Sequence, residues 1–198
     1  MFITFDGIEG GGKTTQIEAL CAMLKQKNIA FIQTREPGGT AIGEQVRELL
    51  LGDNNMHSDT ELLLMFAARA EHVQQVIKPA LAQKKWVICD RFTDASFAYQ
   101  GGGRGLDWQR IQVLADWVHQ KLQPHRSFIF DIDVKVGLQR AKNRSQPDRF
   151  EQETLRFFQQ TRDAYLKLVK DNPQRCRIID ATQTIDTIHQ QIIADLEL

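Results

Sequence analysis

Residues 7–14 read Gly-Ile-Glu-Gly-Gly-Gly-Lys-Thr, which fits the pattern G-x-x-x-x-G-K-[ST]. A chance match in a chain of this composition has a probability on the order of 0.004. An apolar run over residues 2–5 precedes the glycines, and a helical stripe of Ile17, Leu20 and Leu24 follows them. In such a strand–loop–helix unit, backbone N–H groups and the start of the helix hold phosphate oxygens. The motif therefore predicts a nucleotide-binding α/β protein.

The rest of the chain alternates short apolar runs with longer helical patterns. The runs that we expect to form strands cover residues 2–5, 29–33, 86–89, 127–132 and 177–179. They lack a clean polar alternation, which is typical of a sheet covered on both faces. Helical spacing recurs over 17–24, 42–50, 61–83, 111–122, 155–169 and 185–196, and the apolar start of 61–83 predicts deep burial there. We expect one α/β domain over 1–198, with the three-layer P-loop NTPase fold and a parallel five-stranded sheet.

The composition narrows the class of protein further. The chain has 198 residues, with 25 basic and 25 acidic residues, and this neutrality disfavours a dedicated nucleic-acid binder. Its three cysteines are far apart and form no Cys/His cluster, so neither a disulfide framework nor a zinc site is supported. The apolar runs are too short to span a bilayer, and the first residues lack the basic start of a signal peptide. These features predict a cytoplasmic enzyme with no nucleic-acid or membrane partner.

The glycine motif itself supplies the predicted phosphate site. Lys13 would reach the β- and γ-phosphates, and the Thr14 hydroxyl would take a place on Mg²⁺. The apolar run over 86–89 ends in Asp90, which we expect to hold Mg²⁺ through water, although such an aspartate can also simply cap the next turn. In this part of the chain, the residues predicted to bind the ATP phosphates are Gly7, Gly10, Gly11, Gly12, Lys13, Thr14 and Thr15.

Four arginines are candidates for binding a second phosphate. Arg35 and Arg91 follow or end predicted strands, where α/β sheets bind ligands, whereas Arg47 and Arg69 lie on predicted helices. Arginine pairs bidentately with phosphate, which suits an acceptor phosphate, but each could instead form a surface ion pair. The guanine-reading N-K-x-D motif is absent, which excludes a switch GTPase.

Several segments make the chain resemble the thymidylate kinase family along essentially its whole length. They are Phe-Asp-Gly-Ile-Glu-Gly at 5–10, Arg-Glu-Pro-Gly-Gly-Thr at 35–40, Phe-Ala-Ala-Arg at 66–69, Asp-Arg-Phe at 90–92 and Ala-Tyr-Gln-Gly-Gly-Gly-Arg-Gly at 98–105. The resemblance implies transfer of the ATP γ-phosphoryl group to dTMP with Mg²⁺, and a homodimer. In many relatives tyrosine or histidine stands where this chain has Phe92.

The resemblance also implies a role for each residue of the acceptor site. Phe66 would stack on thymine, Arg69 would donate to a pyrimidine carbonyl, and Ser96 and Gln100 would bond the base edge. Glu9 would accept from a sugar hydroxyl and Tyr99 would pack near the ribose 2′ position. Arg35 and Arg91 would bind the acceptor phosphate, and Arg47 would lie near the base or the phosphate.

Residues 137–150 match the family's lid, which closes over ATP. This chain has Gly11, not a basic residue, before Gly12-Lys13, which fits the subtype whose lid supplies catalytic arginines. Arg144 is the first choice for that role, followed by Arg149 and by Arg140, which would also bind the ATP phosphates. With these, the predicted catalytic set is Lys13, Arg91, Arg144 and Arg149. Alternatives are a kinase of another nucleoside monophosphate, a non-catalytic nucleotide-binding regulator and a nucleic-acid-handling ATPase.

Overall fold

The computed structural model describes residues 1–52, 55–142 and 148–198. Within these residues, five parallel strands form one sheet in the order β2-β3-β1-β4-β5. The strands are β1 (Phe2–Gly7), β2 (Phe31–Arg35), β3 (Trp86–Asp90), β4 (Arg126–Asp131) and β5 (Cys176–Asp180). Their ends differ from the predicted ones by no more than two residues, so the predicted strand set and the parallel sheet are confirmed.

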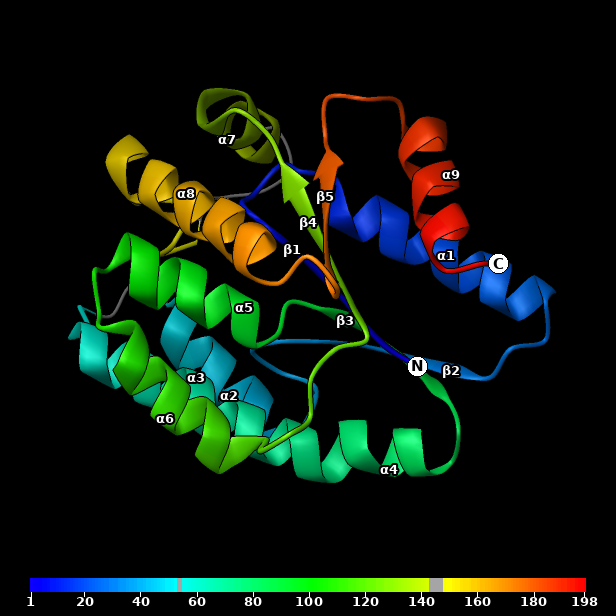
Figure 1. Ribbon diagram of the computed structural model, residues 1–198. Helices are drawn as coiled ribbons and strands as arrows, with labels where there is room; N and C mark the ends of the chain where they lie inside the picture. Colours follow the sequence, from blue (N-terminus) through cyan, green and yellow to red (C-terminus); the bar gives the residue numbers. More distant parts are fainter. Residues whose placement is uncertain (53–54, 143–147) are drawn as a thin grey trace.

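Helices cover both faces of the sheet, as Figure 1 shows, which confirms the three-layer architecture. On one face, α1 (Lys13–Gln26) packs beside α9 (Ile185–Asp195). The other helices are α2 (Ala41–Leu51), α3 (Ser58–His72), α4 (Lys78–Ala82), α5 (Thr93–Ser96), α6 (Trp108–Val118), α7 (Val134–Lys142) and α8 (Leu155–Asp171). None of the helices described is both long and apolar enough to cross a bilayer.

Local sequence explains the burial of the central strand and where several helices begin. All six residues of β1 are buried because this strand is central and covered on both faces, so it shows no polar alternation. Asp107 and Thr184 occupy the N-cap positions of α6 and α9, and the side chain of each accepts a backbone N–H bond there. Thr154 caps α8 in the same way. These caps satisfy N–H groups that have no partner inside the helix.

The segment 61–83 differs from the single helix that its pattern predicts. It contains most of α3, a π-helical turn η1 (Val73–Ile77) and α4. Its apolar start is buried at Leu62 and Phe66, but the Leu63 side chain is 57% exposed, so the prediction of deep burial is wrong for that face. A helix turns 100° per residue, so four consecutive apolar residues cannot all face one core.

The glycine-rich segment after α5 is helical, although its composition gave no helical pattern. It forms a second π-helical stretch, η2 (Phe97–Gly103), which packs along α8. A methyl group on Gly102 would lie 2.6 Å from Ala164 Cβ, and one on Gly103 would lie 2.7 Å from Thr161 Oγ1. Glycine therefore allows the two backbones to approach closely, and this contact positions Tyr99 and Gln100.

The carboxyl ends of β1, β2 and β3 converge on one edge of the sheet. The register pairs Phe5 with Asp90 and Asp90 with Arg35, so the glycine loop after β1 lies beside both strand ends. This edge is where parallel α/β sheets bind ligands.

Candidate active site

The loop between β1 and α1 has a backbone that only glycine adopts without strain. Gly7, Gly10 and Gly12 have φ angles of 126°, 75° and 85°. A methyl group on Gly10 would collide with the backbone of Gly137 at the start of α7. Gly12 occupies the N-cap position of α1 and has no side chain to cap the helix, so the first N–H groups of α1 remain available to an anion.

Lys13 begins α1 and folds back over the loop. Its Nζ donates to the backbone oxygens of Gly7 (3.0 Å) and Ile8 (2.8 Å), and its side chain is buried. Burial, together with the nearby Arg91 guanidinium, lowers the pKa of Lys13 to about 8. A bound polyphosphate would reverse this shift, because it brings negative charge to the ammonium group.

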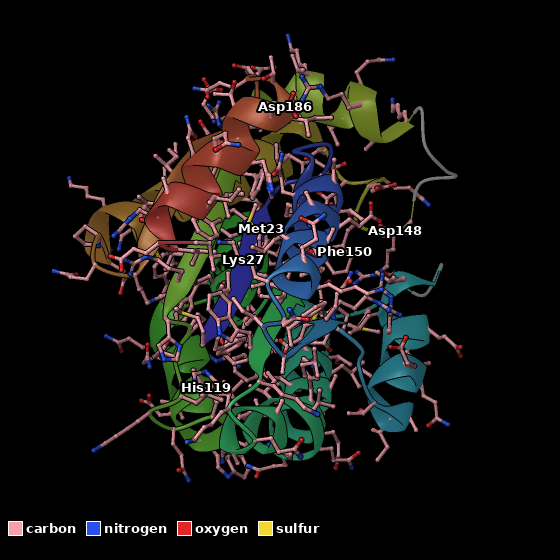
Figure 2. All side chains as sticks on the ribbon, turned by 90° about the vertical axis from the view of Figure 1, so that its right-hand side faces the viewer. Met23, Lys27, His119, Asp148, Phe150 and Asp186 are labelled. Atoms are coloured by element: carbon pink, nitrogen blue, oxygen red, sulfur yellow. The ribbon has the colours of Figure 1, made fainter. Side chains whose placement is uncertain are left out.

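A cavity of about 340 Å³ opens between the loop and the ends of β2 and β3. It brings together most of the predicted site residues: Glu9, Gly10, Gly11, Gly12, Lys13, Thr14, Arg47, Arg69, Asp90, Arg91, Ser96, Tyr99 and Gln100. Asp148 and Phe150 line its other side, and Figure 2 shows both on the same side of α1 as α2. Phosphate-binding and base-binding candidates therefore share one space.

Arg91 and Glu9 form the polar centre of this cavity. Arg91 Nη2 donates to Glu9 Oε1 (2.7 Å) and Nη1 donates to the Gly7 oxygen (2.9 Å), while the Tyr99 hydroxyl donates to Glu9 (2.8 Å). Burial works to lower the pKa of Arg91. The electrostatic effect of its neighbours outweighs burial and raises the pKa; these neighbours are Tyr99, Glu9, Tyr165 and Asp90. A permanent positive charge is thus held at the mouth of the phosphate loop.

Arg69 is held by three groups, one just after β2 and two at or beside α5. Its side chain is 2% exposed, and it donates to Glu36 Oε2 (2.6 Å), Ser96 Oγ (3.1 Å) and the Phe92 oxygen (3.2 Å). Glu36 also bonds His72 Nδ1 (2.8 Å). Burial works to raise the pKa of Glu36, but Arg69 and His72 overcome it and keep the pKa low.

Phe66 is not among the residues that line the cavity, and its stacking on a base stays a prediction. Its ring is 2% exposed and lies under the Arg69 guanidinium, 4.5 Å from the ring centroid. Met65 lines the cavity instead. Residues four apart lie on one helix face, which is why Met65 and Arg69 both line the cavity.

Arg35 is also not a cavity residue as the structure describes it. Its half-exposed side chain pairs with Glu44 Oε2 at 2.7 Å, although its backbone lies beside Asp90. Arg47, from α2, does line the cavity and donates to the Pro37 oxygen. Burial and the neighbouring Arg35 lower the pKa of Arg47.

The three predicted lid arginines differ in what the structure shows of them. Arg144 lies outside the described residues. Arg149 is turned away from the cavity, since Nε donates to the Leu50 oxygen (2.8 Å) and Nη2 to Glu61 Oε2 (2.7 Å). Arg140 donates to the Ala181 oxygen (3.0 Å) and lines a second hollow beside the loop, which Thr15 also lines. Arg149 thus makes structural contacts in this structure, and its catalytic role stays a prediction.

The residues around Asp90 fit a divalent cation held through water. Asp90 lines the cavity, and its Oδ1 is buried with no hydrogen-bond partner among the described residues. Thr14, in the first turn of α1, lines the same cavity and is exposed. No cluster of three or more His, Cys, Asp or Glu in the described chain could hold a metal alone, so the phosphates would supply most of its ligands.

The glycine loop between β1 and α1, with Lys13 and Asp90 beside it, defines a P-loop nucleotide-binding protein. The family model "Thymidylate kinase" matches residues 5–192. Thymidylate kinases of Vesicomyosocius okutanii and Cupriavidus necator are 52% and 51% identical over 193 residues, which cover 96% of this chain and 94% and 95% of theirs. The crystal structure of thymidylate kinase from Ehrlichia chaffeensis superposes with a TM-score of 0.81 at 39% identity, covering 100% of this chain and 98% of that one. The chain belongs to the thymidylate kinase family, as its motifs predicted.

Proposed function

We propose that the cavity is the place where this chain transfers the terminal phosphoryl group of ATP to the 5′-phosphate of dTMP, giving ADP and dTDP. The observation that carries this proposal is the shared space, in which the phosphate loop and Lys13 face Arg69, Ser96 and Gln100. A phosphate loop alone would support nucleotide binding, whereas the polar groups across the same cavity support the binding of a phosphate acceptor as well.

The donor nucleotide would lie along the loop. Its phosphates would bind the N–H groups of residues 10–15 and the Lys13 ammonium group, which would leave the Gly7 and Ile8 oxygens. The second hollow, of about 410 Å³, lies beside the same glycines and would take the nucleoside of ATP against Arg140. When bound, Mg²⁺ would neutralise phosphate charge, held by Thr14 and through water by Asp90.

The acceptor would enter from the other side of the loop. Arg35 and Arg91 would bind its phosphate, with Arg47 nearby. Glu9, which accepts a hydrogen bond from the Tyr99 hydroxyl in the free protein, would accept one from the sugar hydroxyl. Phe66 would stack on the thymine ring, and Met65, which lines the cavity, would pack nearby. Arg69, Ser96 and Gln100 would bond the polar edge of the base.

The chemistry then needs positioning more than proton transfer. An oxygen of the acceptor phosphate attacks the γ-phosphorus, the bond from that phosphorus to the β–γ bridging oxygen breaks, and ADP leaves with the electron pair. The acceptor phosphate is already anionic, so no general base is required. Lys13 and Arg91 would offset the charge on the transferred group.

We further propose that residues 1–198 form one domain whose lid spans about 137–150, with Arg144 as the arginine that reaches the transferred group. A homodimer is supported by exposed apolar side chains on two neighbouring helices: Leu63 on α3, and Val113 and Trp117 on α6. The three cysteines are unpaired, which is in keeping with action in the cytoplasm.

An ADP-release assay with Mg-ATP tests the reaction against dTMP, dUMP, dCMP, UMP, AMP and GMP. We expect a strong preference for dTMP. Comparable rates with AMP or GMP would show that the chain is a kinase of another monophosphate, and no turnover with any of them would refute the transfer reaction.

A further inference from the structure

Glu61, in the first turn of α3, is a buried carboxylate with no part in the reaction proposed above. Its side chain is fully buried, yet it carries a formal charge. It accepts hydrogen bonds from Gln100 Nε2 (2.9 Å), Arg104 Nη2 (3.0 Å) and Arg149 Nη2 (2.7 Å). Three long-range partners converge on one group, so Glu61 joins η2 and the chain after α7 to α3.

The contact with Gln100 determines how the amide of that residue is turned. A carboxylate paired with two guanidinium groups can only accept hydrogen bonds, so the amide must present its NH₂ group to Glu61. Turning the amide over would place its oxygen against a carboxylate oxygen, inside the protein and without a proton between them. The orientation of the Gln100 amide therefore follows from the chemistry of its partner.

The oxygen of the same amide is left for a ligand. Gln100 lines the cavity. Among the residues that the structure describes, none donates to Gln100 Oε1, and this atom is not sealed away as a buried atom without a partner. The cavity therefore receives a hydrogen-bond acceptor from Gln100, beside the donors of Arg69.

We propose that Glu61 is a positioning residue that sets base specificity: by holding the Gln100 NH₂ group, it presents an acceptor to the base. The inference rests on the proposed function. A thymine or uracil ring has an N–H at position 3, which can donate to that acceptor. Cytosine has a lone pair at position 3, which would face the amide oxygen and leave two acceptors unpaired.

The probe is a pair of nucleotides that differ only at the polar edge of the base: dTMP and 5-methyl-dCMP. Both carry the 5-methyl group, so a difference between them does not arise from apolar packing. For the unmodified enzyme we expect kcat/KM with dTMP to exceed that with 5-methyl-dCMP by at least about 100-fold.

Two substitutions of Glu61 separate positioning from simple support of the fold. In Glu61→Gln, the new amide can donate to Gln100 Oε1, which frees the Gln100 NH₂ group to face the base. We expect the preference for dTMP to fall at least about tenfold, mainly through KM. Glu61→Asp keeps an acceptor-only group, so it should retain the preference even where overall activity drops.

Glu153→Gln is the matched control. Glu153 also pairs with Arg104 but has no bond to Gln100, so this variant should change the preference by less than about twofold. Melting temperatures of all variants show whether each one folds.

The outcomes are distinct. If Glu61→Gln lowers activity with both nucleotides equally, Glu61 only supports the fold and the proposal is wrong. If the unmodified enzyme uses 5-methyl-dCMP within about tenfold of dTMP, the amide does not face the base as an acceptor, and the proposal fails even if Glu61→Gln does not fold. If the unmodified enzyme does not phosphorylate dTMP at all, it is the proposed function that fails.

Discussion

Replacing Gly102 by alanine adds one methyl group at the contact between η2 and α8. The new carbon would lie 2.6 Å from Ala164 Cβ and 2.7 Å from the Gln160 backbone oxygen. Carbon atoms in contact are normally about 3.5–4.0 Å apart. Neither neighbour can rotate away, so the two helices must separate by roughly 1 Å to accept the methyl group.

Gly102→Ala has two opposing effects on the free energy of unfolding: a steric cost at the helix contact and a gain in helix propensity. The sign of the measured change shows which of the two is larger. In an unobstructed helix, a change from glycine to alanine stabilises by about 1 kcal/mol, because alanine has the higher helix propensity. Forced overpacking costs about 1–3 kcal/mol and occasionally more. We expect the steric cost to win, with a net loss of roughly 1–2 kcal/mol and a melting temperature lower by about 2–8 °C.

Thermal and urea denaturation measure the stability of the variant, and steady-state kinetics measure its KM values for dTMP and ATP. Because η2 carries Tyr99 and Gln100, KM for dTMP should rise more than KM for ATP. Adding Ala164→Gly removes one of the two clashes, so the double variant should be more stable than the sum of the single effects by about 0.5 kcal/mol or more. A stabilised Gly102→Ala variant, or strictly additive effects, would refute the steric reasoning.

Three other perturbations test other parts of the structure. The pKa of Lys13 is about 8 in the free protein, and only its charged form attracts phosphate. The affinity for ATP, measured by calorimetry, should therefore fall about tenfold per pH unit above pH 8. An affinity that stays constant from pH 7 to 10 would contradict this. Glu36→Gln leaves the Arg69 guanidinium buried without its counter-charge, so we expect a loss of about 3–5 kcal/mol in urea unfolding and a higher KM for dTMP; an unchanged denaturation midpoint would show that the pair contributes little. Trp117, 79% exposed, should lie in the proposed dimer interface, so Trp117→Glu should produce monomers in sedimentation velocity, whereas a chain that is monomeric before the change would rule the interface out.

The glycine loop, the five strands and the helix caps could be predicted from the sequence because each depends on neighbours within a few residues. Positive φ angles at Gly7, Gly10 and Gly12 follow from the lack of a side chain, and Asp107 and Thr184 cap helices that start directly after them. The family motifs added the donor and acceptor residues, most of which line one cavity.

The tertiary structure decided which side chains reach that cavity. Phe66 and Met65 are adjacent in an apolar run, and only the packing of α3 shows that Phe66 lies under Arg69 while Met65 lines the cavity. Arg149 contacts Glu61, 88 residues away, and Gln100 contacts it across 39 residues. The direction of a long side chain depends on partners that the fold brings together from distant segments, and no local pattern contains that information.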